Sequence, residues 1–142
     1  MDIVSLIERE LQSLEKELQV LSQVTTKRRH LPLDEIEVRG AALSLASLYN
    51  GMERILKQIV LHRGETLSDS PNWHNALLQK SAALQLISQS TIEEMKGFLS
   101  FRHFVRHAYS FEIDPKAIDT ILDAAPGLVQ TFMAEIRSLT IE

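Results

Sequence analysis

Residues 2–28 read DIVSLIERELQSLEKELQVLSQVTTKR, and this stretch sets the expected fold class. Its apolar residues recur at alternating spacings of three and four, which aligns them along one side of a helix. They are Val4, Ile7, Leu11, Leu14, Leu18 and Leu21. The sequence therefore predicts a long amphipathic helix from Asp2 to about Arg28. We interpret the basic residues 27–30 as partners of the helix dipole, with RNA contact as the alternative, and Pro32 ends the helix.

Four more helices are expected downstream. A second long helix from about Leu33 to Leu61, with Asp34 as its N-cap, would form an antiparallel hairpin with the first because the two lengths are similar. Three further helices are predicted at 72–86, from a capping signature at Ser90 and Thr91 to about Ala108, and from Asp114 onward. Pro126 and Gly127 should kink or split the last helix. The fold class is therefore all-α, an antiparallel bundle of about five helices, in one domain at 1–142.

The composition narrows the functional classes. The chain has 142 residues, no cysteine and a formal net charge of −4. Disulfides, thiol nucleophiles and cysteine-ligated zinc are therefore excluded, and broad electrostatic binding of RNA is disfavoured. The acidic N-terminus is unlike a signal peptide, and charges interrupt every apolar run that could span a membrane. We expect a cytoplasmic protein without a membrane partner.

Chemistry concentrates in RHFVRHAY, residues 102–109, where four cationic side chains fall within six residues of an acidic protein. They are Arg102, His103, Arg106 and His107. One interpretation is that these cations only stabilise the C-terminal end of a helix. His103 and His107 lie four residues apart but lack the glutamate and cysteine partners of common metal sites, so we expect no metal and no cofactor.

The alternative interpretation is a site that handles phosphate. Arg102 can grip phosphate oxygens with two parallel hydrogen bonds, and His107 can take up and release a proton near neutral pH. Cleavage of RNA by its own 2′-hydroxyl requires neither a metal nor a protein nucleophile. RNA is therefore a plausible substrate for this pair of residues.

The spacing RxxxxHxY near the end of a helix, in a short all-helical chain, resembles the HEPN superfamily, and within it the HepT-like ribonuclease toxins. This resemblance implies a HEPN-like bundle that acts as a homodimer, in which Arg102 and His107 of two copies meet and catalyse RNA cleavage. It also implies a type VII toxin–antitoxin pair. The antitoxin would be an MntA-type nucleotidyltransferase that silences the toxin by attaching AMP to Tyr109.

Four accessory residues complete the expected site. His103 and Arg106 are candidates for RNA phosphate contacts, and Asn50 and Glu53 on the second helix could reach Arg102 and orient it. Trp73 and His74 could stack on a base, although a lone tryptophan is more often part of the core. A different functional class stays open: a non-catalytic helical partner or substrate-binding subunit of a nucleotidyltransferase.

Overall fold

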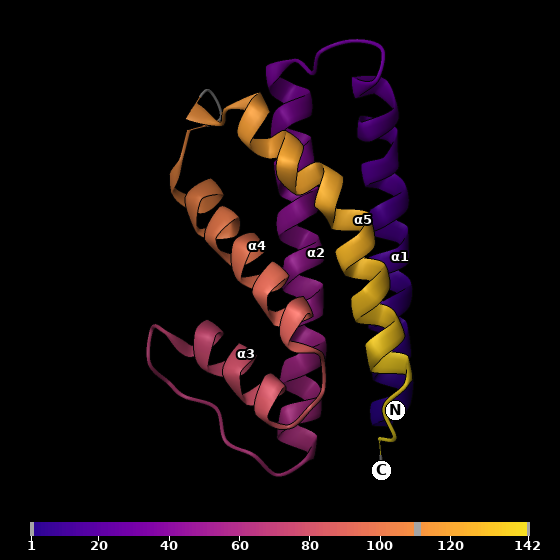
Figure 1. Ribbon diagram of the computed structural model, residues 1–142, viewed down its shortest axis with the longest axis vertical. Helices are drawn as coiled ribbons and strands as arrows, with labels where there is room; N and C mark the ends of the chain where they lie inside the picture. Colours follow the sequence, from indigo (N-terminus) through magenta and orange to yellow (C-terminus); the bar gives the residue numbers. More distant parts are fainter. Residues whose placement is uncertain (1, 110–111, 142) are drawn as a thin grey trace.

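The computed structural model describes residues 2–109 and 112–141, which form five helices and no strand (Figure 1). The helices are α1 (Ile3–Arg28), α2 (Glu35–His62), α3 (Trp73–Ala83), α4 (Gln89–His107) and α5 (Pro115–Arg137). The prediction of an all-α bundle of about five helices is confirmed. None of the described helices combines the length and apolar composition that crossing a membrane requires.

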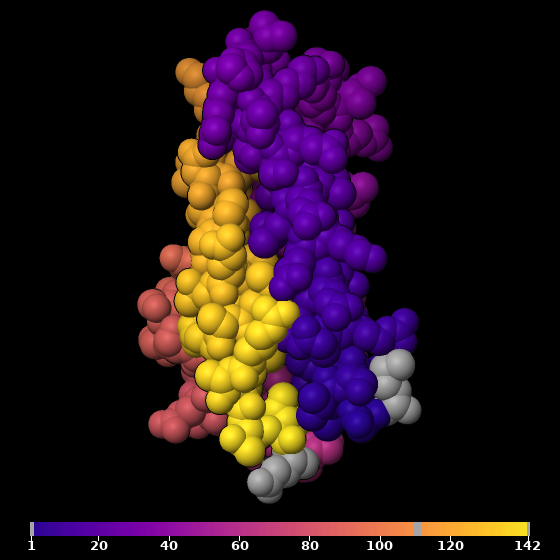
Figure 2. All heavy atoms as spheres, turned by 90° about the vertical axis from the view of Figure 1, so that its right-hand side faces the viewer, coloured from indigo at the N-terminus to yellow at the C-terminus, as the bar shows by residue number. Residues whose placement is uncertain are grey.

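Helix α2 is the centre of the bundle. It packs against each of the other four helices, and the fully buried residues Leu45, Leu48, Met52, Leu56 and Ile59 contribute to one continuous core. Figure 1 shows α1 antiparallel to α2, as the sequence predicts, with α4 and α5 covering other sides of α2. Seen from the side, α1 and α5 run next to each other along one face (Figure 2).

The helix starts follow from capping side chains. Asp2 caps α1, and Asp34 caps α2 as expected and forms a reciprocal capping box with Glu37. Helix α4 instead begins two residues earlier than expected, because the Ser88 hydroxyl accepts a hydrogen bond from the Thr91 amide. Ser90 lies inside the helix. The placement of the cap at Ser90 and Thr91 was therefore wrong by two residues.

The end of α3 also differs from expectation, whereas α5 bends at its proline as one of the two expected outcomes. Helix α3 ends at Ala83, three residues early, and the chain then turns through Gln85 with a φ of 58°. Helix α5 continues through Pro126 and is not split. Buried Ala125 and Leu128 flank this proline in the core, and their packing offsets the lost backbone hydrogen bond. Figure 1 shows that the axis of α5 changes direction near its middle, which agrees with the predicted kink.

Ion pairs connect the ends of the helices. Arg28 donates to the Asp119 carboxylate at 2.7 Å and also pairs with Asp123 on α5, while Lys27 pairs with Glu37 on α2. At the other end, Arg137 bridges Glu8 and Glu15 of α1 at 3.2 and 3.1 Å. Lys27 and Arg28 therefore have partners within the fold, which favours their structural interpretation over a contact with RNA.

The closest approach of α1 to α2 yields a stability prediction. A Cβ atom on buried Gly51 would lie 2.7 Å from Leu14 Cδ2, whereas one on exposed Gly97 of α4 would meet nothing within 4 Å. Alanine at Gly97 should raise the free energy of unfolding by about 0.5–1 kcal/mol through helix propensity alone. At Gly51 the same gain is opposed by overpacking, which costs about 1–3 kcal/mol. We expect urea unfolding to show Gly51→Ala at least about 1 kcal/mol less stable than Gly97→Ala. Equal stabilities would mean that Leu14 can move aside without cost.

Candidate functional site

A groove of about 630 Å³ lies between the first half of α2 and the last turns of α4. Three arginines line it: Arg39 from α2, and Arg102 and Arg106 from α4. Its remaining wall is largely apolar and includes Ala42, Ala46 and Val105. Three guanidinium groups around one groove of an acidic protein create a local site for an anion. Sequence reasoning gave Arg39 little weight, because only the tertiary packing brings it to the motif.

Arg102 is held in this groove by Asn50. The Arg102 Nε–H donates a hydrogen bond of 2.7 Å to Asn50 Oδ1, so Asn50 reaches the motif helix as the sequence suggested. Arg102 Nη1 is buried and has no hydrogen-bond partner among the described residues. An unsatisfied buried donor is costly, and a phosphate oxygen in the groove would relieve that cost.

The two motif histidines lie on a different side of α4 from Arg102. Successive helical residues turn by about 100°, so Arg102 and His107 are about 140° apart around the axis. His103 and His107 are one turn apart in an adjacent row, and both side chains are exposed. One chain therefore presents the motif arginine and the motif histidine to neighbouring surfaces rather than to one enclosed pocket.

Tyr109 lies just beyond α4. The helix ends at His107, and Ala108 adopts an extended conformation with φ −91° and ψ 144°. Tyr109 therefore does not continue the helical face that carries Arg102 and Arg106. The Tyr109 amide donates to the Glu112 carboxylate at 2.9 Å, and 72% of the residue is exposed. Its position leaves the side chain accessible to another protein.

Glu53 occupies a different place from the expected one. It is buried, and its Oε2 lies 2.7 Å from Nδ1 of buried His74 on α3. The expectation that Glu53 contacts RNA or orients Arg102 is therefore corrected, because this carboxylate is inside the bundle with another partner. Glu53 also adds to the effect of burial in raising the pKa of the buried Tyr49 phenol far above its ordinary value. Sequence reasoning considered His74 only for stacking on a base and missed its contact with Glu53, which is 21 residues away.

The His74 ring links this buried carboxylate to the motif. It lies edge to face with the His103 ring, with 5.7 Å between centroids, and it stacks on Trp73 at 3.8 Å. Burial lowers the pKa of His103, and the charges of His74 and of the other motif cations lower it further. Lys57 Nζ lies over the Trp73 ring, 5.3 Å from its centroid. Protein groups therefore already contact the Trp73 ring that was expected to stack on a base. In the part of the chain that the structure describes, no three His, Asp or Glu residues gather around a possible metal position.

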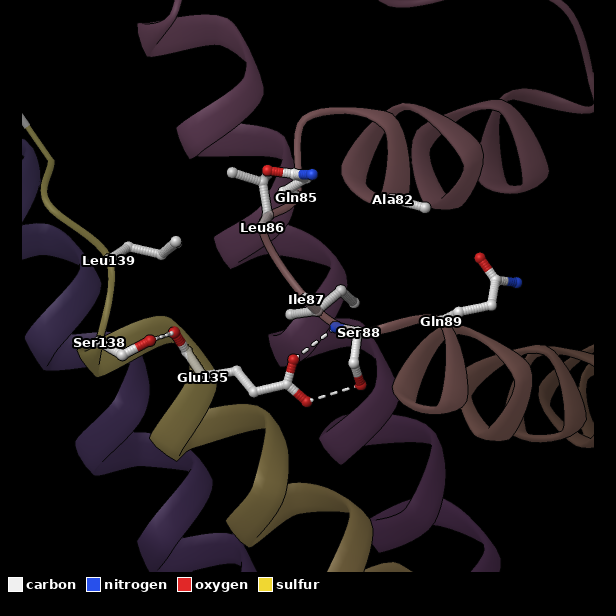
Figure 3. A pocket seen from close by; sticks show the side chains of 9 residues that line it. All are labelled: Ala82, Gln85, Leu86, Ile87, Ser88, Gln89, Glu135, Ser138 and Leu139. Carbon is white, nitrogen blue, oxygen red and sulfur yellow. Dashed lines mark hydrogen bonds between the residues drawn. The ribbon is translucent and has the colours of Figure 1, made fainter.

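A second hollow, of about 360 Å³, lies at the start of α4 (Figure 3). Figure 3 shows Glu135 of α5 pointing at Ser88, whose amide and hydroxyl donate to the carboxylate at 2.5 and 3.0 Å. The Thr91 hydroxyl donates to the same carboxylate at 2.5 Å. Glu135 thus already supplies the anion that a helix N-terminus favours. The hydrogen bonds of Glu135 connect α5 to the start of α4, which is a structural role. The arginine groove is therefore the stronger candidate site.

Comparison with known proteins agrees with this choice. A family model described as HepT-like protein matches residues 40–141, a span that includes the complete RxxxxHxY motif and the residues that line the arginine groove except Arg39. No curated protein and no solved structure gives a significant match. The family match covers well over half of the chain and supports a HEPN-like bundle. The chain therefore belongs to the family of HepT-like proteins.

Proposed function

We propose that this protein is a metal-independent ribonuclease toxin of a type VII toxin–antitoxin pair, with Arg102 and His107 as catalytic residues. The observation that carries this proposal is the groove lined by Arg39, Arg102 and Arg106, in which Asn50 binds Arg102 and one buried Arg102 nitrogen has no hydrogen-bond partner among the described residues. Such a groove suits one phosphodiester better than a neutral ligand, because all three charged groups that line it are cationic.

The reaction is attack of a ribose 2′-hydroxyl on the neighbouring phosphorus. As the P–O2′ bond forms and the P–O5′ bond breaks, negative charge grows on the phosphoryl oxygens, where the Arg102 guanidinium can stabilise it. A histidine must accept the proton of the 2′-hydroxyl, and a proton must reach the leaving 5′-oxygen. His107, exposed at the end of α4, can contribute to this proton transfer.

The proposal includes assembly into a homodimer. Arg102 and His107 of one chain face different sides of α4, so a second copy could bring its own motif against the first and complete a shared site. The large apolar side chain of Leu43 lines the groove and is 67% exposed. An apolar rim of this kind would be covered when two copies associate.

The first prediction concerns catalysis. Arg102→Ala and His107→Ala should each reduce RNA cleavage by at least about 100-fold while helicity and thermal stability stay nearly unchanged. Arg39→Ala should weaken RNA binding with a smaller effect on the rate. The matched controls are Arg63→Ala and His62→Ala, an exposed basic pair at the end of α2 opposite to the half that lines the groove. Gel assays with EDTA present should give products ending in a 2′,3′-cyclic phosphate. Normal cleavage by His107→Ala, or dependence on added magnesium, would contradict the proposal.

The second prediction concerns assembly. Light scattering at micromolar concentration should give twice the mass of the chain. Leu43→Glu should shift the protein toward the monomer and reduce cleavage in parallel, because it places a charge on the apolar rim. Val4→Glu, at an exposed apolar position on α1, serves as the control. A monomer that retains full activity would rule out the shared site.

The third prediction concerns silencing by an MntA-type nucleotidyltransferase. AMP on the Tyr109 hydroxyl would add about one negative charge beside the arginine groove and compete with RNA phosphate. Intact mass and peptide mapping of the co-expressed protein should locate AMP on Tyr109. Tyr49, the second of the two tyrosines, should stay unmodified because it is fully buried. Tyr109→Phe should escape silencing. Inhibition of the unmodified protein by its partner would contradict silencing by modification. The partner would then inhibit by covering the site when it binds.

A further inference from the structure

Three side chains from three helices form a line that ends at the motif. Glu53 of α2 meets His74 of α3 at 2.7 Å, and the His74 ring meets the His103 ring of α4 with 5.7 Å between centroids. Glu53 and His74 are 6% and 8% exposed, whereas His103 lies at the surface. The line therefore runs from the interior of the bundle to the motif helix.

Stability alone gives a poor reason for burying this pair. Taking two ionisable groups out of water carries a large desolvation cost, and apolar residues of similar volume often hold helices together equally well or better. The surrounding core consists of such residues, for example Leu77 and Leu78 on the same helix as His74. A buried carboxylate next to an imidazole has another consequence: it fixes the orientation of the ring.

His103 is well placed to use that fixed ring. It follows Arg102 directly in the sequence and lies one helical turn before His107, so the Cβ atoms of the two histidines are about 5–6 Å apart. Both imidazoles can therefore flank a single phosphodiester. His107 has no comparable connection to buried groups among the described residues.

We propose that His103 is the base that accepts the proton of the 2′-hydroxyl, and that Glu53 and His74 are positioning residues that hold its ring in place. This inference rests on the proposed ribonuclease function and deepens it. The 2′-hydroxyl proton passes to the neutral ring of His103 as the P–O2′ bond forms. The protonated ring of His107 gives its proton to the 5′-oxygen as the P–O5′ bond breaks. One proton is taken up and one is released, so the step is balanced.

The charges around His103 suit a base that must begin neutral. Its pKa is lowered by burial first and then by the charges of His74 from α3 and of Arg102, Arg106 and His107 from its own helix. From α2, Glu53 acts on it through His74, and Lys57 lies farther along over Trp73. A lowered pKa keeps His103 neutral to more acidic pH than an ordinary histidine.

The deciding experiment is a titration of the histidine rings in the full-length protein by long-range ¹H–¹⁵N NMR. Five histidines give few signals, and His103→Gln assigns the relevant one. In the wild type, the midpoint of His103 should lie below the ordinary value of about 6.5. In Glu53→Gln/His74→Ala, which leaves no buried charge unpaired, the midpoint should rise toward that value because a cationic and desolvating neighbour is gone. Ser81→Ala is the matched control, since it removes a buried polar group of α3 that bonds only to Leu77.

Either of two NMR results would overturn the positioning role. One is a wild-type midpoint at or above the ordinary value, which needs no variant and holds even if the double variant fails to fold. The other is an unchanged His103 midpoint in a folded double variant. The His103 midpoint could also rise as much in Ser81→Ala as in the double variant. That result would attribute the rise to a general loosening of α3 and would count against the positioning role.

Cleavage kinetics then test the role of His103 as base. The double variant should lose about tenfold or more in kcat with KM nearly unchanged, because Arg102 still binds the phosphate. The acid limb of its kcat/KM profile should move to higher pH together with the NMR midpoint of His103. If the wild type cuts no RNA, the proposed function fails while the NMR result still decides the positioning role. If the wild type cuts RNA and the acid limb does not follow His103, the base is another group.

Discussion

The burial of α2 is the constraint on which the rest of the structure depends. This helix contacts all four others, and fourteen of its 28 residues are buried. A polar residue on one of its buried sides must then be satisfied by a neighbouring helix or exposed at a groove. Asn50 is satisfied by Arg102 and Glu53 by His74, and each of these contacts connects the central helix to the motif region. The helix packing that buries α2 therefore also sets the geometry of the site.

The distribution of charge separates structural cations from those of the site. Arg28 and Arg137 each bind two carboxylates and join α1 to α5, and their pKa values are raised accordingly. The three arginines of the groove make no ion pair with an acidic residue in the part of the chain that the structure describes. In a chain of net charge −4, cations left unpaired around one groove concentrate the attraction for an anion there. This contrast supports phosphate recognition without requiring a basic protein.

The site combines an immobile arginine with accessible groups at the helix end. Asn50 fixes Arg102 by a hydrogen bond. His107, the last residue of α4, and Tyr109, just beyond the helix, are both exposed. A catalytic site benefits from fixed charge, and a residue that another enzyme is to modify must be reachable. The end of α4 provides both conditions within eight residues. Membership of the HepT-like family agrees with that arrangement.

The sequence by itself determined the helices and the motif, because periodic apolar residues and the aspartates before α1, α2 and α5 act locally. It also located Arg102, His107 and Tyr109, and it suggested the contact from Asn50, since spacing along a helix is known in advance. Only the tertiary structure showed that Glu53 turns inward to His74, that Arg39 joins the groove, and that the chain leaves the helix before Tyr109. The first two depend on pairings between helices far apart in the chain, which no local pattern encodes. The third depends on where α4 loses its packing partners.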